Sequence, residues 1–458
     1  MTDPVYLAGL SVSTILLTMK RAAIFLLFIL LLTVAGCELD DGSDPTPSST
    51  EMPPIPTPAD TPALESTPRT TPAITPPPRE LTLTLWTGPD VAPDEELPGG
   101  DILAEQLNAF QSSHPDITLS VEVKTIVEQG GSLSYLRTGR SVAPSILPDV
   151  VLLPANRLAD ASSQGLIYPL DGQLSEEMID DLIPAARELS HVDDRIFGYP
   201  FALTGLQHLI YNESVITETV STNWTTLLSE PPAPFLLPAA GTAGAELPLH
   251  FYLANGGTLV NDTGQPALQE EPLTAALDEI RRGVDAGLID RQSGSTASVE
   301  QTWQIFNSNP SYLIQTSAGY FLDQERADAT RNYQALPLPG LQGPLPPTVN
   351  AWTWAITTPD PTRQALAAEL IRWLGSSANV GEWTLESNTL PARQSSFEVW
   401  PESEYMNFLQ RQLSAAAPAP RGANNNMLSA LSRAASNVIL GLSSPEEAAA
   451  EAVEALQP

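Results

Sequence analysis

PDVVLL, residues 148–153, is the stretch that decides the fold class. The Pro–Asp pair introduces a continuous apolar run, which is typical of a strand buried on both faces of a parallel sheet. Residues 156–164 then predict a short helix that ends at Gly165. A buried strand followed by a helix is the repeating unit of an α/β protein.

The segment before this stretch shows the same alternation. Residues 81–86, LTLTLW, alternate apolar and polar side chains and predict a strand, while Leu103, Leu107 and Phe110 share one helical face. Residues 114–116, His-Pro-Asp, end that helix, and a second alternating strand follows at 117–123. Consecutive strand–helix units predict an α/β body with right-handed crossovers.

Further strands and helices follow downstream, without a recurring period of repeats. We predict strands at 209–211, 312–314 and 351–357, and helices at 272–286, 361–374 and 425–440. A last helix begins at 444–447, Ser-Pro-Glu-Glu, which offers an N-cap, a proline at the first position and a glutamate at the third.

The composition excludes several classes of function. The chain has 458 residues, with 21 Lys and Arg against 54 Asp and Glu, which gives a formal net charge of −33. Such a surface repels phosphate backbones and anionic lipid, which argues against nucleic-acid binding and peripheral membrane docking. The single cysteine, Cys37, excludes a disulfide within the chain and a thiolate zinc cage.

The first segment is predicted to be an export signal. Lys20 and Arg21 precede an apolar run at 22–32, and small residues follow before Cys37, which is the order of a secretory signal. Residues 1–18 fit poorly as a basic n-region, so we expect translation to start at Met19. Residues 34–37, Val-Ala-Gly-Cys, resemble the bacterial lipoprotein signal. This resemblance implies that Cys37 is lipidated and becomes the mature N-terminus, whereas the simpler alternative is a free cysteine after an apolar stretch.

Residues 38–79 are predicted to form a tether. Twelve prolines alternate there with Thr, Ser and Ala, a composition that favours extended chain and cannot build a core. The alternative is a glycosylated stalk or a simple spacer, and in each case the segment carries no catalytic chemistry.

Catalytic motifs are missing from the body. The four histidines form no HExxH pair, and neither a G-x-S-x-G elbow nor a P-loop occurs. Residues 262–264, Asp-Thr-Gly, match the aspartic-protease triplet, but that chemistry needs two copies and one is present. The pairs at 180–181 and 193–194 could serve a glycosidase, although solvated faces and turns explain them better. We therefore expect no enzyme activity, no metal and no cofactor.

From about Leu81 to its end, the chain resembles the bacterial extracellular solute-binding proteins of family 1, the receptors of sugar-importing ABC transporters such as the maltodextrin-binding proteins. The most specific match runs from 197–201, Phe-Gly-Tyr-Pro-Phe, to 209–212, Leu-Ile-Tyr-Asn. Residues 224–228, Trp-Thr-Thr-Leu-Leu, match a family helix, and 253–257, Leu-Ala-Asn-Gly-Gly, match a turn of the second lobe. The segment 231–250 departs from the family because it is rich in Pro and Ala.

The resemblance implies a two-lobed periplasmic-binding-protein fold with an interlobe cleft and hinge crossings. Lobe closure on a ligand is then what a transporter reads. We assign 1–36 to the signal, 37–79 to the lipidated cysteine and linker, 80–200 and 346–392 to the first lobe, 201–345 to the main part of the second lobe, and 393–458 to C-terminal helices that complete the second lobe.

The resemblance also implies that ligand contacts lie in loops after strands and on the crossings. Trp352 and Trp354 share one strand face, which is an aromatic platform if it faces the cleft and core if it does not. The run 424–426 could begin a helix near the cleft or serve as an N-cap cluster. The candidate ligand-binding residues are Trp86, Thr87, Gly88, Asn156, Thr204, Gly205, Ser317, Gly319, Tyr320, Asn350, Trp352 and Asn425.

Three functions compete. The first is an exported, lipid-anchored, monomeric receptor that captures a mono- or oligosaccharide and delivers it to the permease subunits of an ABC importer. The second is a surface-tethered carbohydrate-active enzyme, which needs two converging carboxylates. The third is a receptor for a peptide, polyamine or anion. No clear carboxylate pair or arginine cluster is evident in the candidate loops, so the sequence favours a neutral solute.

Overall fold

The computed structural model describes residues 81–126, 130–327 and 332–457. The described residues all belong to one compact unit. The predicted signal, Cys37 and the tether lie outside the described residues. Within the described part, no helix is both long enough and apolar enough to cross a membrane.

The first sheet is built around the strand predicted to be buried on both faces. Its order is β14-β6-β13-β3-β1-β2, with β15 paired to the start of β13. Every residue of β3 is buried, as the continuous apolar run predicts. The strands are β1 (Leu81–Thr87), β2 (Ile117–Val123), β3 (Val150–Pro154), β6 (Tyr199–Thr204), β13 (Thr348–Ile356), β14 (Leu390–Pro391) and β15 (Ala417–Pro418).

One edge of this sheet collects the ends of four strands. Strands β1, β2 and β3 run parallel, and β13 runs antiparallel to both β3 and β6. The carboxyl ends of β1, β2, β3 and β6 therefore meet the start of β13 at one edge, which is where open α/β sheets bind ligands.

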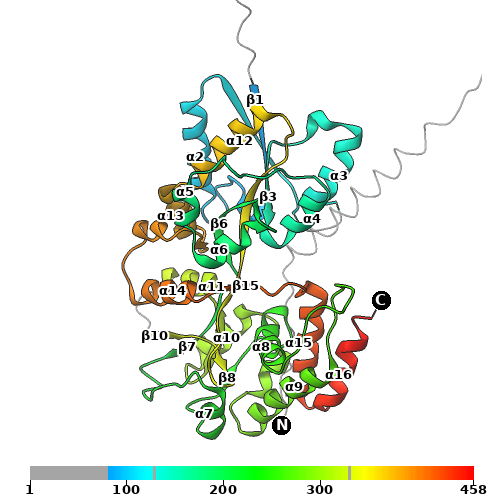
Figure 1. The fold of residues 1–458 in the computed structure, drawn as a ribbon. Coiled ribbons are helices and arrows are strands. Elements are labelled where there is room, and N and C mark those ends of the chain that lie inside the picture. The colour runs from blue at the N-terminus through cyan, green and yellow to red at the C-terminus, as the bar shows by residue number, and fades with distance from the viewer. Residues whose placement is uncertain (1–80, 127–129, 328–331, 458) are drawn as a thin grey trace, which may run out of the picture. The chain divides into compact units, whose positions relative to one another are not determined.

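Helices cover both faces of the first sheet (Figure 1). Leu103, Leu107 and Phe110 are buried on α2, as their spacing predicts. The carboxylate of Asp149, from the Pro–Asp pair, is buried and accepts two hydrogen bonds from Arg363, at 2.7 and 2.6 Å, which attaches α12 to the sheet. The helices are α2 (Gly100–Ser113), α3 (Ser132–Val142), α4 (Leu158–Ser163), α5 (Glu176–Asp180), α6 (Pro184–Leu189), α12 (Pro361–Leu374) and α13 (Ser377–Glu386).

The second sheet has the order β10-β7-β9-β8. Leu209, Phe235 and Leu313 belong to one hydrophobic cluster, whereas their neighbours Ile210 and Ile314 belong to the other. Because successive side chains of a strand point to opposite faces, both faces of this sheet are buried. Its strands are β7 (Gln207–Asn212), β8 (Phe235–Leu236), β9 (Leu313–Ser317) and β10 (Tyr333–Leu336).

Different helices cover the two faces of the second sheet. One cluster includes α7 (Trp224–Ser229), α8 (Glu246–Ala254), α9 (Glu270–Asp285), α15 (Asn425–Leu440) and α16 (Pro445–Glu454). The other includes α10 (Val299–Ser308), α11 (Ala318–Ala327) and α14 (Glu404–Ser414), and it is continuous with the core of the first sheet. Short pairs complete the structure: β4 (His191–Val192) with β5 (Arg195–Ile196), and β11 (Pro339–Gly340) with β12 (Gly343–Pro344).

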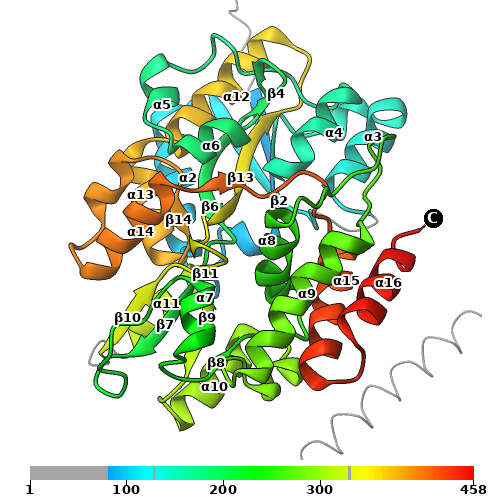
Figure 2. The ribbon, with the colours of Figure 1, turned by 60° about the horizontal axis from the view of Figure 1, so that its bottom comes forward.

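Three connections join the two sheets and their helices. Residues 205–206 lead from β6 to β7, 337–347 lead from β10 to β13, and 415–424 lead from α14 to α15. Gly205 has a φ of 88°, a left-handed conformation that glycine adopts without strain, so the first connection can turn sharply. The predicted α/β fold, with two halves and hinge crossings, is confirmed (Figure 2).

Most local predictions agree with the structure, with small differences in bounds. The predicted helix at 156–164 is a 3₁₀ turn, Ala155–Arg157, followed by α4. The predicted strand at 351–357 begins three residues earlier, because Thr348 and Val349 pair with β15. Ser444 and Glu447 form the predicted capping box of α16, and residues 262–264 form an exposed turn.

Candidate functional site

Several predicted site residues gather at the carboxyl edge of the first sheet. Asn350 pairs with Thr204 across β13 and β6, and the α-carbon of Trp352 lies opposite that of Pro154 at the end of β3. Asn156 follows β3 and is exposed, while Gly205 is exposed directly after β6. Strand pairing therefore brings Asn156, Thr204, Gly205, Asn350 and Trp352 to one region.

The start of β13 presents one partly exposed row of side chains. Thr348, Asn350 and Trp352 are half-buried, and they alternate with Val349 and Ala351, which are buried. This row combines a hydroxyl, an amide and an indole at the edge where the strands end.

The two tryptophans of β13 have different roles although they share a face. Trp354 is 1% exposed, and its ring stacks on Phe201 with 4.9 Å between ring centroids. Trp352 lies two residues closer to the carboxyl edge and stays partly exposed. The face is therefore core at Trp354 and accessible surface at Trp352.

Glu246, the first residue of α8, reaches the same strand from the second half of the body. Its Oε1 accepts hydrogen bonds from Thr348 Oγ1 at 2.7 Å and from His250 Nε2 at 3.0 Å. The side chain is 17% exposed, and the described residues give its Oε2 no partner. A half-buried carboxylate oxygen at this place can accept hydrogen bonds from a ligand.

Sequence reasoning missed Glu246. Glu246 has no neighbouring carboxylate, and it stands in a segment that is rich in Pro and Ala. One signal was available, since an acidic residue in the first turn of a helix that follows a strand is favourably placed by the helix dipole. Its contact with Thr348 spans 102 positions in the sequence and needs the tertiary structure.

At the end of β1, the predicted contacts are covered. The Trp86 ring is 3% exposed, and the ammonium of Lys124 lies 5.2 Å from its centroid. Tyr135 approaches the same ring edge-on at 6.4 Å. Thr87 is buried and donates its hydroxyl hydrogen to the carbonyl oxygen of Val91, and Gly88 is also buried. Lys124 and Tyr135 therefore form the accessible surface over Trp86.

The predicted ligand contacts at the start of α11 interact with other residues of the protein. Ser317 Oγ accepts a hydrogen bond from the Tyr320 backbone at 3.3 Å, and the Tyr320 ring lies 5.8 Å from Trp303. A side chain at Gly319 would come within 2.6 Å of the carbonyl oxygen of Asn388. Gly319 thus lies beside the loop that precedes β14. Ser317 pairs with Gln207, directly after the Gly205 connection. Burial, with the charges of Glu300 and Asp323, raises the pKa of Tyr320.

Asn425 is the first residue of α15, and it is exposed. Its neighbour Asn424 is the N-cap, because its side-chain oxygen accepts a hydrogen bond from the Met427 backbone at 3.0 Å. Capping accounts for Asn424 and leaves a ligand contact at Asn425 as a prediction.

Among the described residues, no group of three or more His, Cys, Asp or Glu side chains could hold a metal ion. The polar partners of Glu246 are a threonine and a histidine, without a second carboxylate. Two halves joined by three connections, with polar and aromatic side chains at the strand ends, define a hinged solute receptor.

The sequence pattern of the bacterial extracellular solute-binding proteins matches residues 105–407, and the chain belongs to that family. These proteins are non-enzymatic receptors, and the chain is the solute-binding protein of an ABC transporter. No curated protein matches the sequence.

Solved structures with this fold include several sugar receptors. The GacH receptor of Streptomyces glaucescens, solved without ligand and with acarbose, is 18% identical with a TM-score of 0.60, covering 82% of this chain and 97% of its own. A cyclo/maltodextrin-binding protein with maltotetraose is 16% identical with a TM-score of 0.62, covering 82% and 96%. CpMnBP1 with mannobiose is 17% identical with a TM-score of 0.59, covering 83% and 100%. At this identity the likeness establishes the fold.

Proposed function

We propose that this receptor binds a carbohydrate at the carboxyl edge of the first sheet, with Trp352 as the aromatic contact, and delivers it to the permease subunits of an ABC importer. One observation carries the proposal: the partly exposed row of Thr348, Asn350 and Trp352, to which Glu246 is hydrogen-bonded through Thr348. The sugars bound by the GacH receptor, the cyclo/maltodextrin-binding protein and CpMnBP1 support the same class of ligand.

The chemistry of the row suits a neutral sugar. A sugar ring has an apolar C–H face, which packs on an indole, and a rim of hydroxyls, which need fixed partners. The Asn350 amide provides a donor and an acceptor, although its Oδ1 already accepts a hydrogen bond from the Ala351 backbone at 2.9 Å. Glu246 Oε2 provides a further acceptor. A ligand that lacks matching hydroxyls would leave these groups unpaired, which is the source of selectivity.

Glu246 also contributes to closure in this proposal. It belongs to the helical layer of the second sheet, and Thr348 belongs to the first sheet. A sugar hydroxyl bound to Glu246 and Asn350 together would connect the two halves, so the ligand would stabilise the closed arrangement. We take 80–200 and 346–392 as the first lobe, and 201–345 with 393–458 as the second.

The chain's place in the cell follows from the family and from the N-terminal pattern. The family is extracellular. We infer in addition that Cys37 carries the lipid anchor, that residues 38–79 tether the body, and that the receptor is a monomer.

A panel of ligands tests the proposal. Maltotriose, maltotetraose, mannobiose and monosaccharides are compared with spermidine, a tripeptide and phosphate by thermal shift and titration calorimetry. We expect a sugar to raise the melting temperature and to bind at millimolar concentration or below. The variant Glu246→Gln should weaken that sugar about tenfold or more, because a charged acceptor is replaced by a neutral one.

Arg411→Gln, an exposed change on α14, is the matched control and should bind like the wild type. Binding of spermidine or the peptide without any sugar would establish a different solute class. Hydrolysis of a sugar by the pure protein would contradict the receptor itself.

A further inference from the structure

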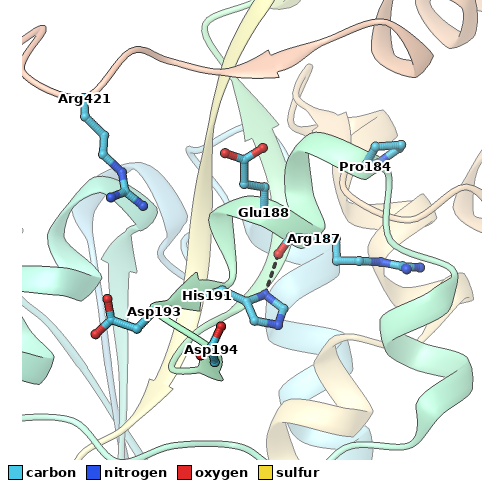
Figure 3. A pocket seen from close by; sticks show the side chains of 7 residues that line it. All are labelled: Pro184, Arg187, Glu188, His191, Asp193, Asp194 and Arg421. Atoms are coloured by element: carbon cyan, nitrogen blue, oxygen red, sulfur yellow. Dashed lines mark hydrogen bonds between the residues drawn. The ribbon is translucent and has the colours of Figure 1, made fainter.

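A cavity of about 640 Å³ is lined by residues of two segments that are far apart in the sequence (Figure 3). Six lining residues come from α6 and the β4–β5 hairpin, and the seventh, Arg421, comes from the connection between α14 and α15. The six are Pro184, Arg187, Glu188, His191, Asp193 and Asp194.

The charges around this cavity are not balanced by ion pairs. Within the described part of the chain, Glu188, Asp193 and Asp194 form no salt bridge, and neither does Arg421. The other cation, Arg187, is already occupied, because its guanidinium lies 3.3 Å from the carboxylate of Asp180 and donates to the Asp180 carbonyl at 2.7 Å. Arg421 is therefore the lining cation that is available to the three carboxylates.

Two of the three carboxylates, those of Asp193 and Asp194, lie on the turn between β4 and β5, and that of Glu188 lies on α6. Asp193 has a φ of 52° in the two-residue turn between β4 and β5, and His191 is fixed by a 2.8 Å hydrogen bond from Nδ1 to the Arg187 carbonyl. Such two-residue turns set the direction of the side chains they carry. Figure 3 shows the side chains of Arg421 and Asp193 pointing toward each other across the opening.

Arg421, in contrast, lies on a segment that belongs to the hinge. Before it, β15 pairs with the first-sheet strand β13, and after it, Asn424 caps α15 of the second half. A side chain at Gly422 would come within 2.9 Å of the Leu259 carbonyl oxygen, so this turn is packed against the second half. A rotation of that half relative to the first sheet would carry Arg421 with it and change its distance to the β4–β5 hairpin.

We propose that Arg421 closes onto Asp193 and Glu188 in a second orientation of the two halves, so that this charge pair biases the open–closed equilibrium of the receptor. The present structure is the unpaired orientation. The pair forms and breaks as the hinge moves, and its free energy stabilises the orientation in which it is formed. An exposed pair of this kind changes an equilibrium constant roughly two- to fivefold. Two experiments test this proposal, and only the second, which measures solute affinity, rests on the proposed function.

The first experiment needs no ligand. Spin labels at Ser141→Cys on α3 and Glu270→Cys on α9, in a full-length Cys37→Ser background, report the distance between the two halves. Both positions are exposed. We expect Arg421→Gln, and separately the acceptor variant Glu188→Gln/Asp193→Asn, to move the distance distribution in the same direction. The triple variant should move it no further, and the control Arg411→Gln should leave it unchanged.

The second experiment measures affinity for the sugar found by the ligand panel. Arg421→Gln and the acceptor variant should change the dissociation constant in the same direction, two- to fivefold, without additivity. The exchange Arg421→Asp with Asp193→Arg should restore the wild-type value. Distance distributions unchanged in both variants, or shifts that add in the triple variant, would overturn the proposal. A failure of every sugar to bind would contradict the proposed function and leave the distance measurement as the test of the charge pair.

Discussion

His208, the second residue of β7, is the most deeply buried ionisable base in the described part of the body. Its Nδ1 lies 3.3 Å from the Leu209 carbonyl, and its Nε2 lies 2.8 Å from the Tyr405 hydroxyl. The rings of Phe321 and Phe408 approach it edge-on. A neutral imidazole that donates from Nδ1 to the Leu209 carbonyl and accepts at Nε2 from the Tyr405 hydroxyl satisfies both contacts.

Burial lowers the pKa of His208 to about 4 from its ordinary value of 6.5. Below pH 6.5 the unfolded chain binds this proton and the folded protein does not, so stability falls as the pH falls from 6.5 to 4. The loss is about 3 kcal/mol in total. Urea unfolding at several pH values should therefore give a shallower decline for His208→Leu than for the wild type.

Tyr405→Phe separates burial from hydrogen bonding in that measurement. This variant keeps the imidazole buried, and burial is the main cause of the low pKa. We expect it to retain the wild-type decline between pH 6.5 and 4. A decline that is the same in His208→Leu as in the wild type would show that other groups cause it.

At the scale of the element, β13 shows how one strand serves two purposes. Its far half is core, where Phe201 and the helices around it cover Trp354, and its near half passes the edge where β3 and β6 end. Exchanging each tryptophan for leucine should separate these roles. Trp352→Leu is expected to weaken sugar binding tenfold or more with a stability change below about 1 kcal/mol, since the site is partly exposed.

Trp354→Leu is the matched variant from the same face. It leaves a cavity in the core and is expected to lower the free energy of unfolding by about 2–4 kcal/mol while the folded protein keeps its sugar affinity. The two measurements are titration calorimetry and denaturant unfolding. Equal effects of the two variants on affinity would place the solute elsewhere.

The elements could be predicted from the sequence where local chemistry determines them. The apolar run of β3, the helix at 425–440 and the Ser444 capping box depend on neighbouring residues, and they agree with the structure. Accessibility at the site depends on residues that are distant in sequence. Alternation places Trp352 and Trp354 on one face, but tertiary neighbours such as Phe201 cover Trp354. Likewise, Trp86 lies near the end of β1, and Lys124, directly after the neighbouring strand β2, lies over its ring.

At the scale of the whole molecule, the net charge and the N-terminal segment both affect how the receptor stays close to the membrane. A receptor that serves an importer has to stay close to the membrane, yet a chain with a net charge of −33 is repelled by anionic lipid. A lipid anchor followed by a long proline-rich tether would reconcile these demands, because the acyl chains hold the molecule while the extended segment keeps the acidic body away from the surface.

Cys37 is the residue on which this arrangement depends, although it lies outside the described residues. In cells that produce the full chain, we expect the protein to incorporate labelled palmitate and to sediment with membranes. Cys37→Ser should abolish both, because one thiol is the only attachment site in the chain. Ser43→Ala, a change a few residues into the tether, is the control and should behave like the wild type. A Cys37→Ser protein that still sediments with membranes would mean that the uncleaved apolar run at 22–32, and not a lipid on Cys37, holds the receptor there.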